Sequence, residues 1–161
     1  MYEELREAIC LRDRGCLEQA NERLIELAEL HKEDALIHYH CAWSFDALGR
    51  ETEAISHYVK AIESDLQGDE LKGAYIGLGS TYRSVGMYDL AIQTFEKGLE
   101  VFPANPALTI FYSMALYNIG RHEKAMELLL NGIVDHTKNE EIKSFERAIR
   151  FYSTQLNTIW T

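Results

Sequence analysis

Proline is almost absent from this sequence, which contains only Pro103 and Pro106 among 161 residues. Because proline interrupts helices more strongly than any other residue, a chain with so little of it can be helical over most of its length. Long apolar runs are also absent. No stretch of about 18 consecutive apolar residues occurs, so we expect no segment that spans a membrane.

Cysteine is the next scarce residue, with Cys10, Cys16 and Cys41 present and no CxxC pair among them. An odd number without paired spacing argues against a disulfide framework and indicates reduced thiols in a cytoplasmic protein. The N-terminal stretch MYEELREAICLRDRG is charged and amphipathic and has no apolar central region. We therefore expect no secretory signal there.

Clusters of basic residues are the third absence. The chain carries 16 Lys and Arg against 26 Asp and Glu, a formal net charge of -10. Nucleic-acid binding usually needs a basic patch, and an acidic chain is repelled by anionic membranes, so we expect neither as a partner. The remaining composition, 47% hydrophobic and 26% charged, is typical of one soluble globular domain.

Glycine, in contrast, recurs at a nearly fixed interval. Gly15, Gly49, Gly86 and Gly120 are separated by 34, 37 and 34 residues. Seven residues before each glycine stands a small residue, five after it an alanine, and nine after it a large apolar residue. These columns hold Ala8, Ala42, Gly79 and Ser113; Ala20, Ala54, Ala91 and Ala125; and Leu24, Tyr58, Phe95 and Leu129.

The four columns predict four stacked helical hairpins. A first helix ends at the glycine, which adopts the left-handed conformation without steric cost, and a second helix folds back. The small residue and the alanine lie where the two helices approach most closely. The large apolar residue fills the space between hairpins, so each hairpin needs its neighbour to cover it.

This pattern resembles the tetratricopeptide repeat (TPR) family, whose unit is 34 residues long. The clearest copy, residues 72–105, carries Tyr75, Leu78, Gly79, Tyr82, Gly86, Tyr88, Ala91, Phe95 and Pro103 at the family's positions, and departs only at Gly98, where alanine is usual. The other copies are residues 1–34, 35–68 and 106–139, and the segment from Tyr39 to about Lys138 also resembles a smaller bacterial TPR subfamily. The resemblance implies an all-α domain over residues 1–161, a right-handed superhelical TPR solenoid.

Two segments fall outside the regular copies. Three extra residues in DLQGDELKG are expected to lengthen a loop, with Gly68 ending one helix and Asp69 capping the next. Residues 140–159 are expected to form one long amphipathic helix that caps the solenoid, with Phe151 and Trp160 outside its apolar stripe. The stripe consists of Ile142, Phe145, Ile149, Tyr152, Leu156 and Ile159.

Candidates for chemistry are few. His38 and Cys41 lie three residues apart on one helical face and could share a metal, but they occupy core columns and no second ligand pair has matching spacing. Cys16 has no partner base in its vicinity, and GLGSTYRSVG lacks the order of a phosphate-binding loop. We therefore expect no catalytic residue, no metal and no cofactor.

The resemblance places the first helix of each repeat on the concave side of the solenoid, where a partner would bind. The inner-facing positions are Tyr2, Leu5, Ile9 and Arg12; Leu36, Tyr39, Trp43 and Asp46; Ile76, Ser80 and Arg83; and Ala107, Ile110, Met114 and Tyr117. The Lys, Asn and Arg that some TPR proteins use to clamp a C-terminal carboxylate are replaced by Leu5, Ile9, His40, Gly73 and Gly77. This lining favours an apolar peptide or amphipathic helix.

These features predict a cytoplasmic, non-catalytic protein–protein interaction scaffold with an apolar and aromatic groove, self-associating as a homodimer or holding an unidentified protein or peptide. The groove aromatics could equally be covered by the chain's own C-terminal helix or by a second copy. Two alternatives stay open. One is a regulatory sensor that binds a peptide or small ligand in the groove; the other is an enzyme that uses Cys16 or the pair His38 and Cys41.

Overall fold

The computed structural model describes residues 2–160 and contains ten helices and no strand in that range. In chain order they are α1 (Tyr2–Asp13), α2 (Leu17–Leu30), α3 (Ala35–Ala47), α4 (Glu51–Glu63), α5 (Gly68–Ser84), α6 (Tyr88–Val101), α7 (Pro106–Asn118), α8 (His122–His136), α9 (Glu140–Ser144) and α10 (Glu146–Ser153). The all-α prediction is confirmed. Residues 1 and 161, the ends of the expected domain, lie outside the described residues. No helix in residues 2–160 has both the length and the apolar character needed to cross a membrane.

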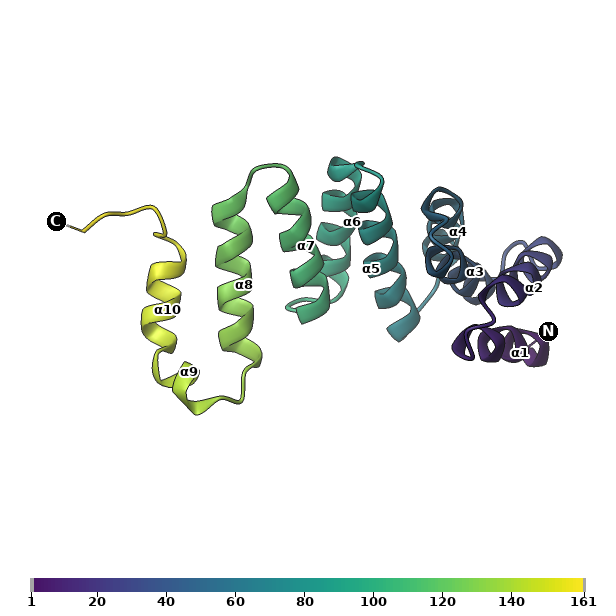
Figure 1. The fold of residues 1–161 in the computed structure, drawn as a ribbon, viewed down its shortest axis with the longest axis horizontal. Coiled ribbons are helices and arrows are strands. Elements are labelled where there is room, and N and C mark those ends of the chain that lie inside the picture. The colour runs from purple at the N-terminus through teal and green to yellow at the C-terminus, as the bar shows by residue number, and fades with distance from the viewer. Residues whose placement is uncertain (1, 161) are drawn as a thin grey trace.

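The first eight helices form four hairpins that stand side by side in one row (Figure 1). Each first helix also contacts the first helix of the next hairpin, α1 with α3, α3 with α5 and α5 with α7. The second helices make no comparable contact with one another in the described part of the chain. The first helices therefore lie on the inner side of the row, and the predicted solenoid of hairpins is confirmed.

Each hairpin turns at the repeated glycine. Gly86 has a φ of +80°, which only glycine adopts without strain. Its N–H donates to the Arg83 carbonyl at 3.1 Å, and the N–H of Met87 donates to the Tyr82 carbonyl at 2.8 Å, so the last carbonyls of α5 are satisfied. The other three turn glycines also have positive φ, between +69° and +82°. The predicted turns are confirmed at all four positions.

Side-chain caps begin three of the helices. Asp34 accepts hydrogen bonds from the backbone N–H groups of Leu36 and Ile37 at 3.0 and 3.1 Å at the start of α3. Asn105 and Asn139 each accept one backbone N–H in the first turns of α7 and α9, at 3.0 and 3.1 Å. Each cap satisfies a donor that has no partner within its own helix.

Small residues allow the helices of a hairpin to approach closely. A methyl group placed on Gly79 of α5 would lie 2.5 Å from the Phe95 ring of α6, well inside van der Waals contact. Ala8, Ala42 and Ser113, in the same column, are all buried. The column is therefore a steric requirement of the hairpin, as the sequence predicts.

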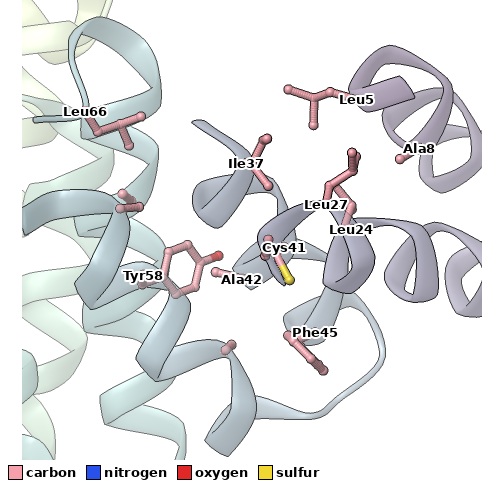
Figure 2. Close-up of a cluster of buried hydrophobic side chains, with 14 of the residues drawn as sticks. Leu5, Ala8, Leu24, Leu27, Ile37, Cys41, Ala42, Phe45, Tyr58 and Leu66 are labelled. Carbon is pink, nitrogen blue, oxygen red and sulfur yellow. The ribbon is translucent and has the colours of Figure 1, made fainter. Parts of the chain in front are cut away.

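The core runs between the helices rather than through one centre. Figure 2 shows Leu5 of α1, Leu24 and Leu27 of α2, and Ile37 and Cys41 of α3 around one apolar contact region. Burying a side chain such as Leu24 or Ile37 stabilises the fold by about 1.5–3 kcal/mol. Each hairpin thus depends on the next one to bury its apolar face.

The three extra residues lengthen a helix rather than a loop. Glu63 ends α4 and Gly68 begins α5, so the prediction that Gly68 ends one helix and Asp69 caps the next is wrong. The connection to α5 is no longer than its counterparts, and α5 has 17 residues where α3 and α7 have 13. Asp69 and Glu70 in its first turn favour a helix because their negative charges are attracted to the positive end of the helix dipole.

The C-terminal segment is not the single helix expected over residues 140–159. It breaks at Phe145 into α9 and α10, and the chain leaves the helix after Ser153. The β-branched Thr154, Thr158 and Ile159 have low helix propensity, which accounts for the early end. The apolar stripe is also largely exposed, because Phe145, Tyr152, Leu156 and Ile159 all face solvent.

Candidate functional site

The inner face of the first hairpin is less open than the sequence suggests. Tyr2 is exposed and Ile9 is half-buried, but Leu5 is 2% exposed and Arg12 is 8% exposed. Leu5 belongs to the apolar core, so its side chain is not open to a partner on the inner face. Arg12, expected as an inner-facing position, is likewise an internal group.

Arg12 supports the aromatic residues of α3. Its guanidinium carbon lies 3.7 Å from the centroid of the Trp43 ring, a cation–π contact. The same guanidinium lies 3.3 Å from Nδ1 of His40 and pairs with Asp13 at 3.0 Å. Burial, and then the Arg12 charge, lower the pKa of His40 to about 4, so the ring is neutral at pH 7 and its Nδ1 accepts from Arg12.

Trp43 is the exposed member of this group. Tyr39 and His40 flank its ring at centroid distances of 6.0 and 6.3 Å, and 43% of Trp43 remains exposed. Tyr39 itself packs against Gly73 of α5, where any larger side chain would force the Tyr39 ring to move. The arrangement holds one tryptophan in a fixed orientation with part of its ring open on the inner side.

Asp46, another expected groove residue, joins the second and third hairpins. Its carboxylate accepts hydrogen bonds from the Tyr58 hydroxyl at 2.8 Å and from the Thr81 hydroxyl at 3.0 Å. Burial raises the pKa of Asp46 in spite of these bonds, which by themselves lower it. Both carboxylate oxygens are used within the chain, so Asp46 stabilises the array.

The third hairpin offers one polar group without a partner. Ile76 and Arg83 of α5 are both half-buried. Arg83 donates from a terminal nitrogen to the Asn118 side-chain oxygen at 3.3 Å. Its Nε is buried and has no acceptor among residues 2–160. A buried donor of this kind gains by meeting an acceptor from another molecule.

The fourth hairpin has the most open inner face. Ile110, Met114 and Tyr117 of α7 are 44%, 42% and 63% exposed, at the spacing of one helical stripe. A cavity of about 690 Å³ lies between α7 and α8 beside Ile110, and one of about 330 Å³ lies beside Arg83, Met114 and Tyr117. Of the inner residues expected from sequence, the structure leaves Tyr2, Trp43 and this α7 group the most accessible to a partner.

The second-helix side of these cavities was not foreseen. Met126, Leu129, Gly132 and Ile133 of α8 form their other wall. One signal in the sequence could have indicated that α7 lines an apolar cavity together with its neighbour α8. The 13 residues of α7 include no charged residue, which is unusual for a helix with an open face.

His57 lies between His38 and Cys41 in a series of side-chain contacts. His38 Nε2 donates to the Lys32 carbonyl at 2.9 Å, because a carbonyl can only accept. In the neutral pair His38 Nδ1 therefore accepts from His57 Nδ1 at 2.9 Å, and His57 Nε2 faces the Cys41 thiol at 3.7 Å.

The surroundings of Cys41 do not favour a catalytic or metal-binding role for its thiol. The thiol is fully buried, and burial raises its pKa to about 12, so it is not the thiolate that a nucleophile or a metal ligand requires. Among residues 2–160 no three His, Cys, Asp or Glu side chains are grouped as metal ligands. Cys16 is exposed and precedes α2.

The fold and its inner face define a solenoid of helical hairpins, a class of protein that presents an extended inner surface. The family model described as Tetratrico peptide repeat matches residues 35–156, more than half of the chain, so the chain belongs to the TPR family. The predicted family is confirmed. TPR proteins are protein–protein interaction scaffolds that bind protein or peptide partners, and they are generally non-catalytic.

Solved structures with the same fold are similar over nearly the whole chain. A crystal structure of MamA protein is 18% identical, with 98% of this chain and 77% of that chain covered and a TM-score of 0.69. A MamA RS-1 double mutant is 19% identical, with 94% and 84% covered and a TM-score of 0.71. YrrB, described as a TPR protein with an unusual peptide-binding site, is 15% identical, with 96% and 86% covered and a TM-score of 0.65. At these identities the likeness shows the fold alone. No similar protein was found among curated sequences.

Proposed function

We propose that this protein is a non-catalytic, cytoplasmic adaptor that self-associates and holds an apolar peptide or amphipathic helix on its inner face. The observation that carries the proposal is the set of open apolar residues on the inner helices: Trp43 on α3, and Ile110, Met114 and Tyr117 on α7. Exposed tryptophan, tyrosine and methionine are enriched at the centres of protein interfaces. Few charges interrupt this face, which favours an apolar partner over an acidic or basic one.

Two local features support a binding role for this face. Trp43 is held by Arg12 and flanked by aromatic rings, so little side-chain entropy is lost when a partner covers it. The Nε of Arg83 is buried and has no acceptor among residues 2–160, so a shift of this side chain toward a carbonyl or carboxylate of the partner would gain a hydrogen bond. An apolar anchor with one directed polar group is the usual composition of a specific site.

Tryptophan fluorescence tests the proposal directly. In a Trp160→Phe background Trp43 is the sole tryptophan and reports on its own environment. Titration with a panel of synthetic amphipathic helical peptides is expected to shift Trp43 emission to the blue and to raise the melting temperature. Trp43→Ala should remove the thermal shift, whereas Leu30→Ala on the exposed side of α2 should keep it. If no peptide in the panel shifts either signal, the inner-face assignment is wrong.

A second candidate is a regulatory sensor, and the unpaired Arg83 Nε beside a cavity of about 330 Å³ favours it. A ligand that pairs with this donor would stabilise one curvature of the row over another. Small-angle X-ray scattering with and without a bound peptide distinguishes the two functions. A change in the radius of gyration supports a sensor, and an unchanged curve at saturation supports an adaptor.

A further inference from the structure

The last hairpin keeps an apolar face that the other hairpins cover. Nine residues after the turn glycine, Leu24, Tyr58 and Phe95 are at most 3% exposed because the next hairpin packs over them. The equivalent residue of the fourth hairpin, Leu129, is only half-buried. The fourth hairpin therefore has the apolar face that a following hairpin covers in the other repeats, and no fifth hairpin follows it in residues 2–160.

A pair of glycines shows the same difference at atomic detail. Gly98 and Gly132 both lie twelve residues after a turn glycine. A methyl group placed on Gly98 would lie 3.1 Å from Leu108 of α7 and 3.1 Å from Tyr75 of α5. One placed on Gly132 would meet no described atom within 4 Å. The space that α7 fills over α6 is empty over α8.

This space is continuous with the open face of α7. The two cavities described above share Leu129 and extend along α7 and α8 in succession. We call them together the α7–α8 groove, formed by Ile110, Met114, Met126, Leu129, Gly132 and Ile133. The groove offers apolar side chains from two adjacent helices, which is the form of surface that receives a third helix.

The C-terminal helix of the same chain packs on α8 beside the groove, and Asn131 and Asp135, which contact it, also line the larger cavity. Asn131 and Asp135 of α8 bond to Ser153 and Arg150 of α10, at 3.5 and 2.6 Å, and Val134 between them is buried. The corresponding residues of the other second helices are the exposed Glu29, Glu63 and Glu100. The replacement of glutamate by valine gives α8 a second contact face and leaves the groove uncovered by α10.

The outward face of the C-terminal segment presents aromatic side chains around Arg147. Phe145, Phe151, Tyr152 and Trp160 are each at least half exposed, and we call them the aromatic end. Trp160 folds back so that its ring lies 5.8 Å from Phe151 and 6.5 Å from Tyr152, between centroids. The chain thus carries a groove and an aromatic surface, both uncovered, at the same end.

Charge is distributed in a way that singles out this end for self-association. Residues 1–101 hold ten Lys and Arg and twenty Asp and Glu, whereas residues 102–161 hold six of each. The whole net charge of -10 is therefore carried by residues 1–101. Two copies that met along their N-terminal parts would repel each other, and two copies that met at the neutral end would not.

We propose that the α7–α8 groove receives the aromatic end of a second copy of this chain. The two copies exchange these surfaces about a two-fold axis, so each groove and each aromatic end is used once. Nine large side chains are then covered on each copy, roughly 800 Å² per copy, the size of a standard specific interface. The inference rests on the self-association in the proposed function, and it places the dimer contact at the last hairpin. There the second copy covers Ile110 and Met114, and the inner face around Trp43 is left for a peptide.

Filling the groove tests this assignment. Gly132→Leu puts a side chain into space that is empty in one copy, so the variant is expected to fold with an unchanged or higher melting temperature. Light scattering over a concentration series should show a dimer for the unaltered chain and at least a tenfold weaker dimer for Gly132→Leu. The matched control Leu30→Ala removes an exposed apolar side chain elsewhere and should dimerise normally.

The outcomes separate this inference from the proposed function. A dimer that withstands Gly132→Leu, or a chain that stays monomeric throughout the series, overturns the inference. If Trp43→Ala dissociates the dimer and Gly132→Leu does not, the dimer contact lies around Trp43, and the inference fails while the adaptor function stands. If no peptide shifts Trp43 emission to the blue, and Gly132→Leu still weakens the dimer, the peptide-binding function fails while the inference stands.

A disulfide between copies provides a second, independent test. In a Cys10→Ser and Cys16→Ser background, one copy carries Ile110→Cys and a larger tagged copy carries Phe151→Cys. Mild oxidation is expected to yield a disulfide-linked pair of mixed size, visible on a non-reducing gel. The control uses Leu30→Cys in place of Ile110→Cys. If the mixed pair forms no faster with Ile110→Cys than with Leu30→Cys, the proposed contact is wrong.

Discussion

At the scale of single residues, the polar side chains of the inner helices mostly bond within the chain. Asp46 illustrates this, because both of its oxygens accept from neighbouring helices. Arg12 likewise makes a cation–π contact with Trp43, a hydrogen bond with His40 and an ion pair with Asp13. Sequence position placed these residues on the inner side of the row, but only the contacts show which of them remain free for a partner.

His40 makes stability depend on pH. Its folded-state pKa, about 4, lies below the ordinary value of 6.5, so between these values the unfolded chain binds a proton that the folded chain does not. The free energy of unfolding should therefore fall as pH falls from 6.5 to 4, by up to about 3 kcal/mol, and level off below that. Urea denaturation at several pH values measures it.

The control for this prediction is His40→Gln, which removes the titrating ring. Burial and the neighbouring His38 also lower the pKa of His57, which contributes in the same direction, so part of the slope should remain in the variant. An identical slope in both proteins would show that His40 does not titrate as described.

Two glycine substitutions are expected to have opposite effects on stability. Gly79→Ala pushes a methyl group against the buried Phe95 ring and should cost about 1–3 kcal/mol. Gly132→Ala adds a methyl group in open space within α8 and should gain about 0.5–1 kcal/mol from better helix propensity. Thermal denaturation of both variants at low concentration checks the pair. Destabilisation by Gly132→Ala would mean that the groove is filled within a single copy.

At the scale of helices, the hairpins follow from local rules, and the exceptions follow from longer-range ones. The turn glycines and small residues could be read from sequence because each serves a contact within one hairpin. The early start of α5 was missed because the repeat alignment placed the extra residues in the loop, although Asp69 and Glu70 favour helix there. The break at Phe145 was missed because an apolar stripe predicts a helix only where something covers it.

The link made by Asp46 is expected to stabilise the junction of α3, α4 and α5. Asp46→Ala leaves the buried Tyr58 hydroxyl without its acceptor, which should cost about 1–3 kcal/mol. Asp46→Asn keeps one oxygen and should cost less. Urea denaturation measures both variants, and equal losses would show that the carboxylate contributes by charge and not by hydrogen bonding.

At the scale of the whole molecule, the main contacts between helices of residues 2–160 join neighbouring hairpins, so stability varies along the row. The candidate site could be foreseen in part for the same reason. Repeat spacing identified the inner positions on α3 and α7, but spacing is equal for Gly98 and Gly132, and only the presence of a following hairpin distinguishes them. A sequence repeat does not show which hairpin has an apolar face that no following hairpin covers.

Local opening should reflect this arrangement. The helix α10 contacts α8 on one face and is exposed on the other, whereas α3 to α6 are packed between neighbours on both sides. Backbone amides of α10 are expected to exchange with solvent at least tenfold faster than those of α3 to α6 in hydrogen-exchange mass spectrometry. In the proposed dimer this difference should shrink as concentration rises, and a concentration-independent rate would speak against coverage by a second copy.

The uneven charge of the chain has a consequence for its orientation. Because residues 1–101 carry the entire net charge, the centre of negative charge is displaced from the centre of mass toward the N-terminal part. A single copy near a positively charged surface would therefore turn that part toward it and leave the last hairpin facing away. In a pair joined through the last hairpins the two displacements point in opposite directions along the molecule, and this preferred orientation is lost.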